Sequence, residues 1–167
     1  MPDPEASQAP DFEVIDGIAG FAEQAETLLS GARKSLDVLT QELDRRVYST
    51  DSFLQAARKF VLQNPHVRMR ILVHNPLKAL AGGNRLIEFG RSLGTFVEFR
   101  ELSAENKALV EEYLIADGRL LLHRMQPEHR TARLYKNAPH LARLKLKYFD
   151  PLWNEAQTVQ EFRSLAV

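Results

Sequence analysis

Two apolar segments of strand length, residues 35–40 and 67–74, constrain the fold more than any other feature of this chain. In the first, Leu36 and Val38 alternate with polar residues, but Leu39 makes the apolar positions nearly continuous, which is typical of a strand buried on both faces of a sheet. A strand, a helix and a second strand in this order predict a parallel unit, and hence an α/β protein. The helix between the two segments is indicated by apolar residues at helical spacing: Phe53, Leu54, Ala57, Phe60 and Val61.

A tight hairpin is expected in the second half of the chain. Asp117-Gly118 separates two strand-like segments, 110–116 and 119–125. This dipeptide is typical of two-residue turns between antiparallel strands, so the parallel strands are followed by antiparallel ones. The other expected elements are helices at 14–31, from Asn84 to Gly94 and from Ala138, the last interrupted at Asp150-Pro151, and strands at 96–102 and 131–136.

These elements together predict one mixed sheet. Its parallel strands come first, a C-terminal antiparallel hairpin follows, and helices cover both faces. Residues 1–10 are expected to be a disordered tail, because they hold three prolines and few apolar side chains. Residues 11–167 are then expected to form a single domain.

Charge is distributed unevenly along the chain, although the formal net charge is zero. Residues 1–31 carry seven acids and no Lys or Arg, whereas residues 119–148 carry eight bases and one acid. Two interpretations stay open: the two segments neutralise each other or lie solvated, or the basic segment meets an anionic ligand, nucleic acid or an acidic partner. The candidate basic surface consists of Arg133, Lys136, His140, Arg143 and Lys147.

Several classes of protein are excluded by composition. The absence of cysteine excludes a disulfide scaffold, a Cys-ligated metal site and a cysteine nucleophile. No apolar run approaches the ~20 residues of a membrane span, and the first residues are polar and acidic, so we expect a cytoplasmic protein. The histidines do not follow metal-ligand spacing, and no metal or cofactor is expected.

Polar side chains gather where the predicted parallel strands end, which is the usual place for a ligand in an α/β sheet. Arginine and histidine in such a cleft would hold an anion. In the alternative interpretation, Asp44 and Arg46 form a local ion pair, and His74 and Asn75 cap the following turn. The candidate anion or ligand site consists of Asp44, Arg45, Arg46, His74, Asn75, Arg100 and Asp117.

Three segments resemble one half of the phospholipase D superfamily fold: residues 32–38, 67–73 and 112–119. The resemblance implies a phospholipase D-like α/β domain. In active members, a histidine that attacks phosphorus and a lysine that neutralises phosphate precede the aspartate of the third segment. With Asp117 as that aspartate, Val110 stands at the histidine position and Glu112 at the lysine position. None of the five histidines fits the motif elsewhere, so we expect no phosphohistidine catalysis.

The chain also resembles, over roughly residues 20–157, a degenerate bacterial branch of this superfamily found behind GNAT-type acetyltransferases. Residues 42–44, 70–74, 84–87 and 149–153 carry this resemblance, while the acetyltransferase itself is absent. It implies a catalytically inactive module with a regulatory, ligand-sensing or scaffolding role. The partner would be a second copy, as a homodimer, or an acetyltransferase-type protein. The alternative is a protein that handles phosphoesters or nucleic acid through a rearranged site and the basic segment 119–148.

Overall fold

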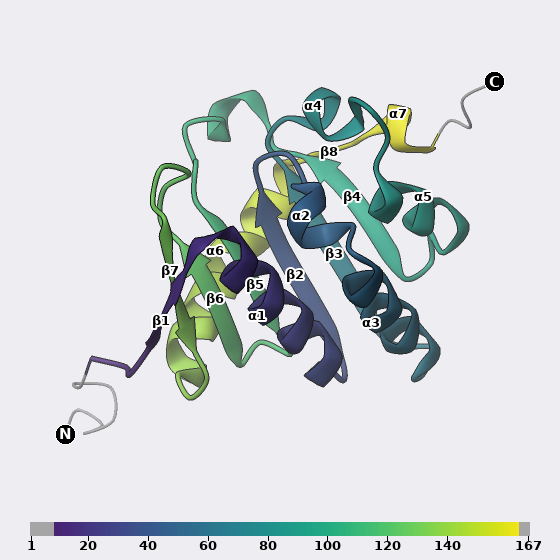
Figure 1. Ribbon diagram of the computed structural model, residues 1–167. Coiled ribbons are helices and arrows are strands. Elements are labelled where there is room, and N and C mark those ends of the chain that lie inside the picture. The colour runs from purple at the N-terminus through teal and green to yellow at the C-terminus, as the bar shows by residue number, and fades with distance from the viewer. Residues whose placement is uncertain (1–8, 164–167) are drawn as a thin grey trace.

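The computed structural model describes residues 9–163, and an eight-stranded mixed sheet runs through that part of the chain (Figure 1). β2, β3 and β4 are parallel, while β5, β6 and β7 follow as antiparallel neighbours on the other side of β2. The strand order is β1-β7-β6-β5-β2-β3-β4-β8. The predicted mixed sheet is therefore confirmed. The strands are β1 (Glu13–Asp16), β2 (Ser35–Thr40), β3 (Arg68–Val73), β4 (Val97–Glu101), β5 (Glu112–Ala116), β6 (Leu120–Arg124), β7 (Thr131–Tyr135) and β8 (Gln157–Thr158).

Helices cover both faces of the sheet, as predicted. α1, α2, α3 and α5 pack on one face, and α6 lies across the other, behind the sheet in Figure 1. Among the helices described, none is long and apolar enough to cross a membrane. The helices are α1 (Gly17–Gly31), α2 (Arg45–Tyr48), α3 (Asp51–Leu62), α4 (Pro76–Leu80), α5 (Arg85–Ser92), α6 (Pro139–Glu155) and α7 (Gln160–Arg163), with a 3₁₀ turn, η1, at Ala104–Asn106.

β2 shows how the sheet divides the core into two layers. Leu36 and Val38 point into the larger cluster beneath α1 and α3, whereas Leu39 joins the smaller cluster beneath α6. Successive side chains of a strand point to opposite faces, so a strand covered on both faces needs apolar residues at nearly every position. Leu36, Val38 and Leu39 meet this need in β2, while the buried Asp37 is paired with Arg70.

The N-terminal element differs from the prediction of one helix over 14–31. Residues 13–16 form β1, which pairs antiparallel with β7, and α1 begins only at Gly17. Gly17 has a φ of +73°, a conformation that glycine adopts without steric cost, and its N–H donates to the carbonyl of Arg130. Ile15 is the buried residue of β1. The strand depends on a partner more than a hundred residues away, which helical periodicity cannot reveal.

The last helix also differs from its prediction, because Asp150-Pro151 does not interrupt it. A proline costs a helix one hydrogen bond, and tertiary contacts can offset that cost. Phe149 and Trp153, one turn apart on either side of the proline, are both buried and stack with ring centroids 6.0 Å apart. Their burial against the sheet holds α6 continuous. α2, α4, β8 and α7 are short elements that the sequence patterns did not predict.

The acidic and basic segments meet in the fold. β1 lies beside β7, and exposed ion pairs join Glu13 to Lys136 and Asp16 to Arg130, each at 3.0 Å. The zero net charge therefore includes direct neutralisation between these segments. Of the tail predicted for residues 1–10, residues 1–8 lie outside the described part of the chain.

Candidate functional site

The end of the sheet at which β2 and β3 finish, uppermost in Figure 1, is the place where an α/β sheet usually carries a ligand. We call it the upper end. β5 runs antiparallel to β2, so it begins at the upper end and finishes at the lower one. Val110 and Glu112 therefore belong to the upper end, while Asp117 lies at the lower end beside Ser35.

Glu112 is the centre of a buried polar cluster at the upper end. Its side chain is only 4% exposed. One carboxylate oxygen accepts hydrogen bonds from the Thr40 hydroxyl at 2.6 Å and from the Tyr48 hydroxyl at 2.8 Å, and the other accepts one from Arg124. Burial and the neighbouring carboxylate raise the pKa of Tyr48 well above its ordinary value, so the phenol stays protonated and donates. We refer to these four residues as the Glu112 cluster.

Val110 and Glu112, the positions that the resemblance assigns to the motif histidine and lysine, offer no atoms for phosphoryl chemistry. Val110 is 39% exposed and has no nucleophilic atom. Glu112, at the lysine position, is an anion whose two oxygens are both committed to donors within the protein. A phosphate oxygen would be repelled by this carboxylate.

Asp117 has a structural role at the lower end. Its φ of +56° and that of Gly118 at +64° make the two-residue turn between β5 and β6, as the sequence predicts. The carboxylate accepts hydrogen bonds from the backbone N–H groups of Arg33, Lys34 and Ser35 at 2.7–3.1 Å. It thereby holds the loop that leads into β2. Since the whole of β2 separates it from Asp44, the structure does not bring Asp117 into the candidate anion site.

Three members of that candidate site lie together at the upper end. Asp44 caps α2 and forms a 2.7 Å ion pair with Arg46, and the hydrogen bond from Arg46 lowers the pKa of Asp44. Arg45 donates to the carbonyl of Gly82 at 3.1 Å. Both arginines thus already have acceptors within the protein. They border a hollow of about 350 Å³, lined by Glu42, Leu43, Asp44, Arg45, Arg46, Lys78 and Ala79.

The remaining members are engaged in separate contacts. A ring nitrogen of His74 lies 2.7 Å from the carbonyl of Lys107, and Asn75 caps α4. The Arg100 guanidinium lies 4.4 Å from the ring of Trp153, beneath α6. The contacts of Asp44, Arg46 and Asn75 are those of the alternative interpretation, a local ion pair and a cap.

The candidate basic surface is split between two places. Lys136 is paired with Glu13, and the Arg133 guanidinium lies 4.5 Å from the ring of Phe12, beside β1. The other three residues lie on the exposed outer face of α6, where Arg143 donates to a ring nitrogen of His140 at 3.0 Å. The edge of the sheet and the outer face of α6 therefore present separate positive patches.

The outer face of α6 combines these bases with exposed apolar side chains. Leu144 is 48% exposed and Tyr148 63% exposed. Both lie on the helical stripe that includes His140, Arg143 and Lys147, because residues three and four apart share a face. Within residues 9–163, neither Arg143 nor Lys147 has a carboxylate at ion-pair distance.

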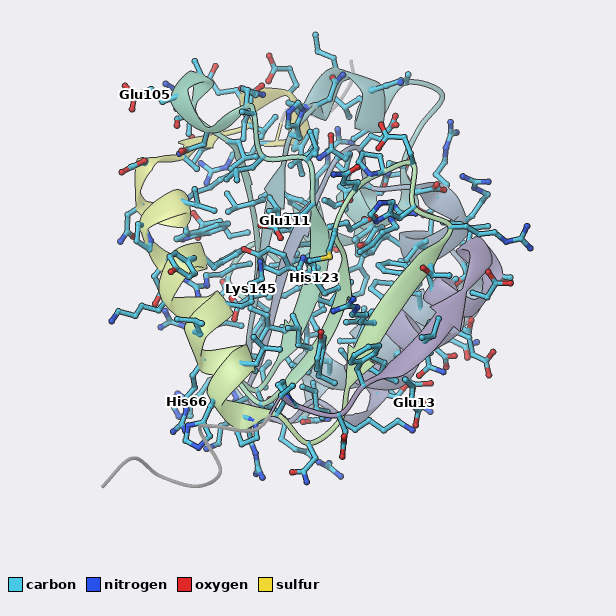
Figure 2. The ribbon with its side chains drawn as sticks, turned by 90° about the vertical axis from the view of Figure 1, so that its left-hand side faces the viewer. Glu13, His66, Glu105, Glu111, His123 and Lys145 are labelled. Carbon is cyan, nitrogen blue, oxygen red and sulfur yellow. The ribbon has the colours of Figure 1, made fainter. Side chains whose placement is uncertain are left out.

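A second polar cluster, which sequence reasoning missed, lies on the face of the sheet covered by α6. Glu111, His123 and Lys145 converge there, as Figure 2 shows. One oxygen of Glu111 lies 2.6 Å from His123 Nε2 and 2.7 Å from the Lys145 ammonium group. Burial alone would raise the pKa of Glu111, but these two partners outweigh it and lower the pKa to about 2.

The register of the β5–β6 hairpin, which the Asp117-Gly118 turn sets, would have indicated that Glu111 and His123 lie on the same face of the sheet. A two-residue turn at Asp117-Gly118 places His123 directly opposite Tyr113. Glu111 is two residues from Tyr113 and so belongs to the same face. Glu112, its neighbour, points to the opposite face, where the Glu112 cluster lies.

Arg70 links the sheet to α6 on the same face. It donates to buried Asp37 at 2.6 Å and to Asp150 at 2.9 Å, and its guanidinium lies 4.9 Å from the Phe149 ring. Burial raises the pKa of Asp37, in opposition to Arg70. The guanidinium also lies 5.6 Å from the Trp153 ring, so Arg70 contacts α6 on either side of Pro151. Among the side chains described, no group of three or more His, Asp or Glu could hold a metal ion.

Comparison with known proteins identifies a family for this chain and solved structures that share its fold. The model of a family described as a domain of unknown function, DUF7931, matches residues 18–165. No curated protein sequence matches the chain.

Three solved structures share the fold. TrmBL2, an archaeal chromatin protein described with a novel mode of DNA binding, is 16% identical with a TM-score of 0.65, over 92% of this chain and 56% of its own. Nuc from Salmonella typhimurium, a phospholipase D family member, is 12% identical with a TM-score of 0.61, over 89% and 99%. NucT from Helicobacter pylori is 10% identical with a TM-score of 0.58, over 89% and 100%. The chain thus spans just over half of TrmBL2, and its fold is phospholipase D-like.

Proposed function

This chain belongs to the DUF7931 family and has a phospholipase D-like fold, and from that premise we propose that it is a binding module without phosphodiesterase activity. Its role is regulatory, ligand-sensing or scaffolding. The observation that carries the proposal is the state of Glu112, a buried carboxylate at the position of the motif lysine, saturated by Thr40, Tyr48 and Arg124.

The chemistry at this position supports a loss of catalysis. Phosphodiester cleavage through a covalent intermediate needs a nucleophile and a cation that stabilises charge developing on the phosphate oxygens. Val110 supplies no nucleophile. Arg124 is a cation at the upper end of the sheet, where a phosphate would need one, but its charge is already balanced by Glu112. The cluster therefore has the properties of a structural ion pair inside a core.

A hydrolysis assay tests the proposal. The purified chain is incubated with bis(p-nitrophenyl) phosphate, beside an active phosphodiesterase as positive control. We expect no release of nitrophenol above buffer. Saturable release that His123→Ala or His74→Ala abolishes would overturn the proposal and support an enzyme with a rearranged site.

The partner proposed for a scaffolding role is a second copy of the chain or an acetyltransferase-type protein, as the family resemblance implies. Light scattering distinguishes the first case. A mass near twice 19.0 kDa supports a homodimer, and a mass that stays at 19.0 kDa at high concentration counts against one. An acetyltransferase partner requires a mixed complex of defined stoichiometry in the same measurement.

Nucleic acid is a second candidate ligand, favoured by the outer face of α6. Arg143 and Lys147 carry charge unpaired by any described carboxylate, and Tyr148 beside them is exposed enough to stack on a base. Cations that contact phosphates bind most strongly at low salt. A retardation assay at low salt with short DNA and RNA tests this role. The double variant Arg143→Ala, Lys147→Ala should abolish any shift, while Lys136→Ala serves as control.

A further inference from the structure

His123 is a buried histidine with one nitrogen held and the other free of partners. It is 8% exposed, and Nε2 contacts Glu111 while Nδ1 has no hydrogen-bond partner within residues 9–163. With its pKa lowered to about 2, Glu111 is ionised near neutral pH and can only accept hydrogen bonds. Nε2 therefore carries the proton of the Glu111 contact. Lys145 binds the same carboxylate oxygen at 2.7 Å and fixes it in place.

His123 also lines a hollow beside the loop between β6 and β7. The hollow measures about 400 Å³ and is of the size that small ligands occupy. Glu111, the partner of Nε2, is not among the residues that line it. Its other lining residues include Met125, Glu128, His129, Arg130 and Arg133.

The charged groups of this hollow are mostly cationic. Arg133 has no carboxylate at ion-pair distance in the described chain, and its guanidinium rests on the Phe12 ring. Arg130 uses only Nε for Asp16, at 3.0 Å, which leaves its terminal nitrogens for another acceptor. Glu128 is the single acid among the lining residues. Two guanidinium groups and a fixed imidazole form a recognition set typical of phosphate, whose oxygens accept several charged hydrogen bonds.

We propose that this hollow is a binding site for a phosphate group, with Arg130 and Arg133 as its cations and His123 as its positioned hydrogen-bonding group. In the neutral ring, Nδ1 accepts the proton of a monoprotonated phosphate; in the imidazolium, it donates to a phosphate oxygen. The site lies on the other side of the sheet from the Glu112 cluster. It does not depend on the absence of phosphodiesterase activity proposed above.

Imidazole NMR signals provide the test. Inorganic phosphate is titrated into the full chain at constant ionic strength, with chloride as the reference anion. We expect saturable shifts of the His123 and His129 signals and none at His66, which lies far from the hollow at the lower end of the view in Figure 2. Shifts that are linear in phosphate, or equal in chloride, would overturn the site.

Two variants test the cations without disturbing the buried cluster. Arg133→Ala and Arg130→Ala each remove an exposed guanidinium, and each should weaken phosphate binding about tenfold, because a charged hydrogen bond is lost. Arg58→Ala, which removes an exposed arginine on α3, is the matched control and should bind as the unmodified chain does. Unchanged affinity in both hollow variants would contradict the proposal. The phosphate group could come from inorganic phosphate or from a phosphate monoester. A second titration with glycerol phosphate distinguishes them, since tighter binding of glycerol phosphate than of inorganic phosphate indicates a monoester ligand.

Discussion

The carboxylate of Asp117 accepts a 2.7 Å hydrogen bond from the backbone N–H of Lys34. It accepts further bonds from the N–H groups of Arg33 and Ser35, so one side chain joins the β5–β6 turn to the loop that leads into β2. Asp117 is the residue at the aspartate position of the phospholipase D motif that the resemblance implies. Its contacts give it a structural role. Its position at the lower end of the sheet is opposite to that of Glu112.

Replacement of Asp117 tests this structural role. Asp117→Ala leaves three N–H groups without their acceptor and puts alanine at a positive φ, so we expect a loss of about 2–3 kcal/mol in the free energy of unfolding. Asp117→Asn keeps one acceptor oxygen and tolerates the left-handed conformation, and should lose about 1 kcal/mol. Denaturant unfolding measures both. Equal stability of the two variants would contradict the explanation.

Glu112→Gln should be strongly destabilising. The change leaves Arg124 as an uncompensated charge beside Tyr48, and breaking a buried ion pair on one side costs about 3–5 kcal/mol. Glu105→Gln, on the exposed turn after β4, is the matched control and should stay within about 0.5 kcal/mol. Chemical denaturation compares them. If Glu112→Gln unfolded at the same denaturant concentration as its control, the cluster would not stabilise the fold.

Glu111 should make stability depend on pH in the acid range. Its pKa falls from an ordinary 4.5 to about 2 on folding, so its contribution is fully present above pH 4.5 and is lost as the pH falls from 4.5 towards 2. The contribution is on the order of 3–4 kcal/mol at neutral pH, since one pKa unit corresponds to about 1.4 kcal/mol. Glu111→Gln should flatten the curve of unfolding free energy below pH 4.5. An unaltered slope in this variant would assign the acid sensitivity to other carboxylates.

β1 should be held by burial more than by its ion pairs. Ile15→Ala removes the buried side chain of this strand and should cost about 2–4 kcal/mol. Glu13→Gln breaks only the exposed pair with Lys136 and should cost less than about 1 kcal/mol. Thermal unfolding of the two variants shows which substitution costs more stability. A larger effect of Glu13→Gln than of Ile15→Ala would show that charge, and not packing, attaches the N-terminal strand.

Local signals in the sequence predicted the elements whose contacts are local or whose burial is complete. The apolar runs of β2 and β3, and the Asp117-Gly118 turn, needed no knowledge of distant partners. β1 escaped prediction because its four residues become a strand only beside β7. Pro151 suggested a break because the stacking of Phe149 on Trp153 and the tie to Arg70 cannot be seen along the chain.

The candidate sites divide in the same way. Val110 and Glu112 stand at the histidine and lysine positions that the resemblance implies, and their residue types alone supply neither a nucleophile nor a cation. The alternation of helices and strands, and the residue types at the positions that the resemblance implies, can therefore be read from the chain alone, because both are properties of neighbouring residues. Which charges meet is known only from the fold: Glu112 contacts Arg124, Glu111 contacts His123 and Lys145, and the acidic β1 lies beside the basic β7. Those pairings depend on strand order and on which face each side chain takes, and both are fixed by packing of the whole chain.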